Sequence, residues 1–275
     1  MPQIPTVTLN NGVEIPQLGF GVFQVPDDET AAAVTTALDT GYRSIDTAAI
    51  YDNERGVGQA IADSGIARDE LFITTKLWNT EHGYDNTLRA FDASLNKLGL
   101  DHVDLYLIHW PVPSADKYLQ TWAAFERLLA DGRTRSIGVS NFQPPHLRRL
   151  LDQGGTVPVV NQIELHPVLQ QATLRELHTE QGIVTEAWSP LAQGELLGTP
   201  EIIKIAAKHS KTPAQVILRW HLQLGNVVIP KSVTPSRIRE NIEVFDFELD
   251  GEDLDAVADL DQAHRIGPDP DTFGR

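Results

Sequence analysis

Polar side chains stand at the C-terminal ends of four successive apolar runs in the sequence. Each run is short and nearly continuous in apolar and threonine residues, which is typical of a strand buried on both faces. In chain order the polar side chains are Asp46 with Tyr51, Lys76, His109, and Ser140 with Asn141. In an α/β barrel the C-terminal ends of the strands converge on one face, where barrel enzymes carry out their chemistry. The pattern therefore predicts one site that contains all of these groups.

These residue types suit the delivery of a proton to a carbonyl oxygen. The ordinary pKa of a tyrosine is about 10, so Tyr51 needs a neighbouring charge, and Lys76 can lower its pKa. Asp46 would keep the Lys76 ammonium ionised, and His109 can hydrogen-bond the oxygen of the substrate. The set has no evident nucleophile and no metal-ligand pattern, so a second reactant must complete the reaction. A hydride from a nicotinamide fits that need.

Strand and helix patterns alternate along the chain without a linker-like break. Eight such alternations predict an α/β fold, a (β/α)8 TIM barrel that forms a single domain of residues 1–275. An Asn-Gly step at Asn11 and Gly12 predicts a β-hairpin with a type I′ turn, which would cap one end of the barrel. Residues 250–260 predict a final helix, and residues 261–275 predict a tail that is either solvated or covers the substrate. The predicted barrel strands are 17–21, 44–46, 71–76, 103–109, 134–140, 159–164, 183–188 and 227–230.

The composition limits the classes of partner. The net charge of −16, from 22 basic and 38 acidic side chains, argues against binding to nucleic acid or to anionic lipid. The sequence has no cysteine, no N-terminal targeting pattern and no apolar run of about 18 residues, so we expect a cytoplasmic protein without a membrane span. His166 and His178 lack partners at metal-ligand spacing, and no metal is predicted.

At the level of motifs the chain resembles the aldo-keto reductases over nearly its whole length. The segments 41–48, 73–78 and 104–111 are similar to those that carry the family's catalytic Asp, Lys and His. The resemblance implies a catalytic tetrad of Asp46, Tyr51, Lys76 and His109 in a monomeric, NADPH-dependent carbonyl reductase. Within the family the sequence is most similar to bacterial 2,5-diketo-gluconate reductases. The implied substrate is a small keto sugar acid, dicarbonyl or aldehyde.

The resemblance also implies where NADPH binds. Segments 137–142 and 161–164 are similar to those that hold the nicotinamide carboxamide, and Trp188 is expected to stack on the nicotinamide ring. Residues 229–232 resemble the adenosine-phosphate site, where Lys231 and Arg237 can select a 2′-phosphate at a helix start. The full implied set is Gly21, Val22, Phe23, Ser140, Asn141, Gln162, Trp188, Ser189, Leu191, Lys231, Ser232, Val233, Thr234, Arg237, Glu240 and Asn241.

Three aromatic residues follow predicted strand ends and are expected to wall the substrate pocket together with His109: Phe23, Trp78 and Trp110. The short pattern Gly56-Val57-Gly58 resembles the start of a dinucleotide fingerprint. It lies inside a predicted helix and follows the loop of Tyr51, so we interpret it as a site of close helix packing.

Two other functions remain open from the residues alone. Lys76 could be the nucleophile of a Schiff-base aldolase, which borohydride trapping would reveal. The barrel could also be a regulatory subunit that binds NADPH without turnover.

Overall fold

A parallel sheet of eight strands forms the centre of the structure, a computed structural model that describes residues 4–274. Neighbouring strands follow chain order, and Leu18 pairs with Val228 to join the first strand to the last. The amide of Gly19 donates to the carbonyl of Val228 at 2.8 Å, so the sheet closes and the predicted (β/α)8 barrel is confirmed. The strands are β3 (Phe20–Gly21), β4 (Ser44–Asp46), β5 (Phe72–Leu77), β6 (Val103–Ile108), β7 (Thr134–Ser140), β8 (Val160–Glu164), β9 (Val184–Trp188) and β10 (Val227–Val228).

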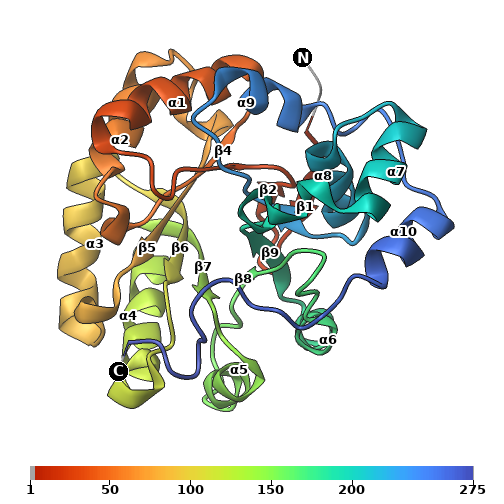
Figure 1. Cartoon of the computed structure of the whole chain (residues 1–275). Helices are drawn as coiled ribbons and strands as arrows, with labels where there is room; N and C mark the ends of the chain where they lie inside the picture. The colour runs from red at the N-terminus through yellow and green to blue at the C-terminus, as the bar shows by residue number, and fades with distance from the viewer. Residues whose placement is uncertain (1–3, 275) are drawn as a thin grey trace.

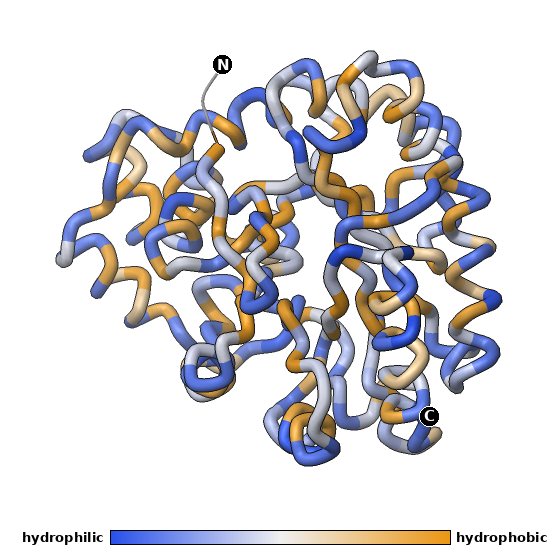
Figure 2. The backbone as a smooth tube through the Cα atoms, turned by 180° about the vertical axis from the view of Figure 1, so that it is seen from behind, coloured by the Kyte–Doolittle hydropathy of each residue, from blue (hydrophilic) through white to orange (hydrophobic). Residues whose placement is uncertain are grey.

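Helices surround the strands, as Figure 1 shows. Apolar residues are concentrated in the strands and recur along the surrounding helices, as expected for helices that bury one face (Figure 2). The helices are α1 (Asp27–Thr40), α2 (Glu54–Asp63), α3 (Tyr84–Leu98), α4 (Tyr118–Ala130), α5 (Pro144–Leu151), α6 (Ala172–Gln181), α7 (Pro200–His209), α8 (Pro213–Gln223), α9 (Pro235–Ile242) and α10 (Gly251–Ala258).

The N-terminal hairpin closes the end of the barrel opposite the predicted site. Its strands are β1 (Thr6–Thr8) and β2 (Glu14–Pro16), and Leu9 and Ile15 pack with residues of the barrel interior. The cap is confirmed, but the predicted type I′ turn is wrong. Of the two turn residues Asn11 and Gly12, only Gly12 has a positive φ, at 83°, and its amide donates to the carbonyl of Leu9. The loop is therefore longer than a two-residue turn.

The two glycines of the discounted fingerprint lie where helices pack closely. A Cβ on Gly56 would lie 2.6 Å from the Asp27 carbonyl oxygen, and one on Gly58 would lie 2.2 Å from that of Leu98. α2 therefore contacts α1 and α3 through bare backbone, as the sequence suggested.

The segment after α10, in dark blue in Figure 1, crosses back over the barrel, and near its end Phe273 contacts Trp78 and Trp110. Glu164 anchors this segment from the end of β8. Its carboxylate accepts from the amides of Ile266 at 2.6 Å and Gly267 at 3.0 Å, and Arg265 lies 3.2 Å away. A side chain on Gly267 would strike the Trp188 ring at 2.4 Å. The tail is therefore held against residues at the C-terminal ends of β8 and β9, and its predicted role over a substrate stays a prediction.

No helix within residues 4–274 is long and apolar enough to cross a membrane. Within the same range, no group of three or more His, Asp or Glu side chains could hold a metal ion. His178 instead hydrogen-bonds Asn161 and Thr185 inside the fold.

Candidate active site

A buried ion pair lies inside the barrel at the C-terminal ends of β4 and β5. The Lys76 ammonium donates to Asp46 Oδ1 at 2.5 Å and to the carbonyl oxygen of Thr47 at 3.0 Å. Burial acts to lower the pKa of Lys76, but Asp46, Tyr51 and Glu186 together outweigh it, so this pKa is raised. Lys76 is therefore a fixed cation.

Tyr51 lies beside this pair on a short 3-10 helix, η1 (Ala49–Tyr51), and the Lys76 ammonium is 5.1 Å from its ring centroid. Asn53 holds the loop: it accepts from the Thr47 hydroxyl at 2.7 Å and donates to the carbonyl of Val22 at 2.9 Å. Burial raises the pKa of Tyr51, and the Lys76 charge opposes this rise. The expected direction of the Lys76 effect is present, but the net pKa is raised because burial outweighs it.

His109 faces Tyr51 with the ring centroids 5.6 Å apart. Burial, followed by the Lys76 charge, lowers the pKa of His109 well below its ordinary value, so the imidazole is neutral. Its Nδ1 is buried and has no hydrogen-bond partner among the described residues. A neutral imidazole carries one N–H, and His109 can donate it to a substrate oxygen.

The predicted carboxamide residues form a hydrogen-bond network on the next three strands. Asn141 donates to the carbonyl of His109 at 2.9 Å and accepts from the Trp188 indole at 2.8 Å. The Ser140 hydroxyl donates to the carbonyl of Gln162 at 2.8 Å. Gln162 Nε2 donates to Asp46 Oδ2 at 2.8 Å. The network therefore joins these four residues to the Lys76 ion pair, and Gln162 Oε1 accepts from no side chain in the described range.

The three predicted aromatic walls lie around the tetrad. Phe23 contacts Tyr51 at 5.0 Å between ring centroids and is 52% exposed, so it stands at the rim. Trp78 contacts His109 at 5.3 Å. Trp110 is buried, at 6% exposed, and lies deeper than the sequence suggested.

The structure adds a fourth aromatic residue, Phe273. Its ring centroid is 4.4 Å from that of Trp110 and 6.3 Å from that of Trp78. The sequence assigned no role to it because nothing in a polar tail of Gly, Pro and Asp indicates a distant docking site.

The predicted phosphate residues surround the start of α9. Lys231 and Arg237 are exposed, and neither forms an ion pair with a described residue. Thr234 is the N-cap and makes no side-chain cap bond, so the first amides of α9 remain free for an anion. Of the remaining predicted residues, Ser232 and Asn241 are buried and Val233 is exposed, while Glu240 accepts from the Thr212 hydroxyl at 2.7 Å.

The other predicted cofactor residues lie near the barrel mouth. Gly21 approaches the last strand closely, since a Cβ there would lie 3.0 Å from the Ile229 carbonyl oxygen. Val22 is fully buried, Ser189 has a positive φ of 48°, and Leu191 is half-buried.

One titratable residue of the barrel interior was missed. Glu186 on β9 is 1% exposed, and its Oε2 accepts from Gln162 Nε2 at 3.0 Å. Burial, followed by the Asp46 charge, raises its pKa to about 7. The run Val184–Trp188 indicated a strand, but not which of its side chains point inward.

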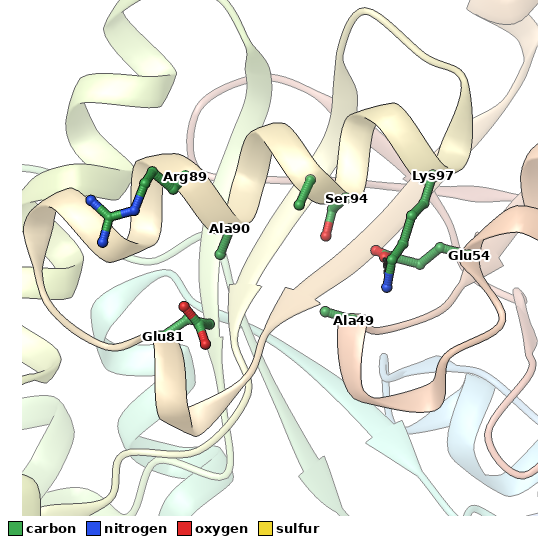
Figure 3. Close-up of a pocket in the computed structure, with 8 residues that line it drawn as sticks. Ala49, Glu54, Glu81, Arg89, Ala90, Ser94 and Lys97 are labelled. Atoms are coloured by element: carbon green, nitrogen blue, oxygen red, sulfur yellow. Dashed lines mark ion pairs between the residues drawn. The ribbon is translucent and has the colours of Figure 1, made fainter.

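A pocket of about 260 Å³ lies outside the barrel, between α3 and the Tyr51 loop. Figure 3 shows Glu54 and Lys97 close together at one end and Glu81 below α3. Glu54 accepts from the Thr75 hydroxyl at 2.7 Å, and its Oε2 is 3.9 Å from the Lys97 ammonium. None of the tetrad residues lines this pocket, which is therefore separate from the candidate active site.

Comparisons with known proteins agree with this geometry. Residues 17–262 match the model of the aldo/keto reductase family. An aldo-keto reductase of Mycolicibacterium smegmatis is 59% identical over 269 residues, 98% of each chain. Methylglyoxal reductase DkgA of Escherichia coli is 53% identical over 273 residues, again 98% of each chain. A crystal structure of a Gox0644 variant in complex with NADPH matches with a TM-score of 0.95 and 51% identity, covering 98% of this chain and 99% of that one. The chain belongs to the aldo/keto reductase family.

Proposed function

We propose that this family member reduces small polar carbonyl compounds with NADPH and that Tyr51 is the general acid. The observation that carries the proposal is the buried ion pair of Lys76 and Asp46 beside Tyr51, with a neutral His109 opposite. Such a set can donate to a carbonyl oxygen from two sides, and it offers no free nucleophile.

A nicotinamide held beside Gln162 and Asn141 would supply the hydride that the carbonyl carbon needs. His109 donates a hydrogen bond that orients the carbonyl oxygen, and Tyr51 gives its proton to that oxygen, so that an alcohol forms. The Lys76 ammonium then stabilises the tyrosinate that remains. A raised tyrosine pKa does not prevent this transfer, because an alkoxide is far more basic than a phenolate.

The chain's own groups fit a nicotinamide dinucleotide phosphate. At one end, both carboxylates next to Gln162 are bound to its Nε2, which leaves Oε1 to accept from a carboxamide N–H. At the other end, the uncapped start of α9 offers amides beside Lys231 and Arg237. Trp188 is proposed to stack on the nicotinamide.

The proposed substrates are small dicarbonyls, keto sugar acids and aldehydes. The aromatic wall of Phe23, Trp78, Trp110 and Phe273 narrows the mouth, which favours a small molecule. The relative that is named a methylglyoxal reductase supports the dicarbonyl class.

The test is the loss of NADPH absorbance on addition of methylglyoxal, a keto sugar acid or a simple aldehyde to the purified protein. We expect turnover with at least one of them. Binding of NADPH without oxidation across the panel would support a regulatory subunit instead.

The aldolase alternative requires a neutral and accessible lysine amine. Lys76 is fully buried, is ion-paired with Asp46 and has a raised pKa, which opposes attack on a carbonyl. A borohydride-trapped adduct on Lys76 would revive that alternative.

Arg237→Ala is expected to weaken NADPH binding by about 10–150-fold and to leave NADH binding nearly unchanged. The physical reason is the loss of one charge-assisted contact to the 2′-phosphate, which is worth roughly 1.5–3 kcal/mol. Fluorescence quenching gives both dissociation constants.

Arg239→Ala is the matched control for this variant, because Arg239 lies on the same helix but lines a surface pocket with Thr36, Asp39 and Thr40. It should leave both constants unchanged. Equal losses for NADPH and NADH in Arg237→Ala would show that Arg237 does not read the 2′-phosphate.

We further propose a single-domain monomer that works in the cytoplasm and binds neither nucleic acid nor membrane. The net charge of −16 supports the last two points.

A further inference from the structure

Glu186 is a buried carboxylate in the barrel interior. One residue, Gln162, lies between it and Asp46 of the proposed tetrad. The neighbour of Glu186 across the β8–β9 ladder is Gln162, so both side chains lie on the same face of the sheet, and the contact of Gln162 with Asp46 shows that this face is the inner one. Gln162 Nε2 is 3.0 Å from Glu186 Oε2 and 2.8 Å from Asp46 Oδ2. One amide nitrogen therefore bridges two carboxylates, and a continuous chain of contacts runs from Glu186 through Gln162 and Asp46 to Lys76.

The charges of Glu186, Asp46 and Lys76 do not cancel when all three groups are ionised. The titratable groups that face Glu186 are Asp46 on β4, Lys76 on β5 and Tyr51 on η1, whereas β8 and β10 contribute Gln162 and valines. One cation then serves two carboxylates. An ionised Glu186 gives this cluster a net negative charge in a water-poor interior, where charges act over longer distances than in water.

The same charge is felt by anything that is held next to Gln162. The nicotinamide ring is cationic in the oxidised cofactor and neutral in the reduced one. A negative charge near a bound nicotinamide would therefore stabilise the oxidised form more than the reduced form, whereas the adenosine and phosphate contacts would be common to both forms.

We propose that Glu186 is a positioning residue that acts through Gln162 and Asp46, and that its negative charge favours the oxidised, cationic cofactor over the reduced one. The inference rests on the proposed function. It adds a residue whose charge makes the affinities for the oxidised and the reduced cofactor differ, although this residue does not contact the substrate.

The decisive experiment measures the dissociation constants of NADP⁺ and NADPH for the wild type and Glu186→Gln by fluorescence quenching. Glutamine keeps the shape and an oxygen that can accept from Gln162, but it removes the charge. At about pH 8.5 we expect the NADP⁺ constant to rise on the order of tenfold in the variant, with little change for NADPH. At about pH 5.5, where Glu186 is protonated in the wild type, the two proteins should agree.

Glu54→Gln is the matched control. Glu54 is equally buried, at 1% exposed, but lies outside the barrel against Thr75. It should leave the ratio of the two constants unchanged at both pH values. An identical ratio in the wild type and Glu186→Gln at the higher pH overturns the inference.

The wild type alone provides a second test if the variant folds poorly. Its preference for NADP⁺ over NADPH should grow as the pH rises through about 7. The 2′-phosphate also titrates in this range, but it is common to both cofactors and cancels in the ratio. A flat ratio contradicts the role of Glu186 even when both cofactors bind and turn over, whereas a protein that binds neither cofactor contradicts the proposed function itself.

The protein without cofactor supplies a third readout. A carboxyl whose pKa is raised on folding holds a proton that the unfolded chain has released, so its contribution to stability falls as the pH rises from about 4.5 to about 7. Glu186→Gln removes this fall. Its melting temperature should therefore increase relative to the wild type between about pH 5.5 and 8.5, whereas a pure packing role would give a constant difference.

Discussion

Tyr51→Phe is expected to lower kcat by about 10²–10⁴-fold and to leave NADPH binding unchanged. The substitution deletes the proton donor but keeps the ring against Phe23 and the Lys76 ammonium. Stopped-flow measurement of NADPH oxidation gives the rate, and fluorescence quenching gives the dissociation constant.

Tyr106→Phe is the appropriate control for this variant. The Tyr106 hydroxyl is also buried and makes no hydrogen bond among the described residues, but Tyr106 packs against Phe91 and Phe125 outside the barrel interior. Its kcat should equal that of the wild type. If Tyr51→Phe kept a third or more of the wild-type kcat on a good substrate, another group would be the acid.

Lys76→Met is expected to abolish turnover and to cost about 3–5 kcal/mol of unfolding free energy at neutral pH. The charge that opposes the raised pKa of Tyr51 is lost, and Asp46 and Glu186 remain buried without a cation. The Lys76 charge no longer lowers the pKa of Glu186, so this carboxylate becomes easier to protonate and the loss of stability should shrink as the pH falls. Urea unfolding at several pH values measures it.

The double variant Asp46→Asn with Lys76→Met separates the two effects. It removes the orphaned charge next to the lost cation, so part of the stability should return while turnover stays absent. Turnover by Lys76→Met near neutral pH would remove Lys76 from the proposed reaction.

The regular elements follow from the sequence because burial repeats with a simple period. β7 has the predicted bounds, and β5 lies within one residue of its prediction at each end. The strand expected at 17–21 is only Phe20–Gly21, because glycines at positions 19 and 21 weaken a regular strand. The four tetrad residues meet at one barrel mouth, and their roles stay predictions.

The features of the site that the sequence did not predict depend on contacts between residues far apart in the chain, which no local sequence pattern encodes. A strand buried on both faces does not reveal which side chains point inward, so Glu186 was invisible. Phe273 meets Trp110 across more than half of the chain. The net pKa of Tyr51 is a sum of opposing terms, burial against a neighbouring cation, and its sign requires their geometry.

The barrel sheet closes between its first and last strands, β3 and β10, through a short set of hydrogen bonds. β3 and β10 contribute only 2 residues each, and the link between them includes the amides of Gly19, Gly21 and Val228. Local opening should cost least free energy at such a short join, so these amide protons should exchange with solvent before those of β5 and β6. Gly21 and Lys231 stand on either side of this join. A ligand that contacts both residues would hold the two ends of the sheet together. Its binding would slow hydrogen exchange of the amides that join β3 to β10.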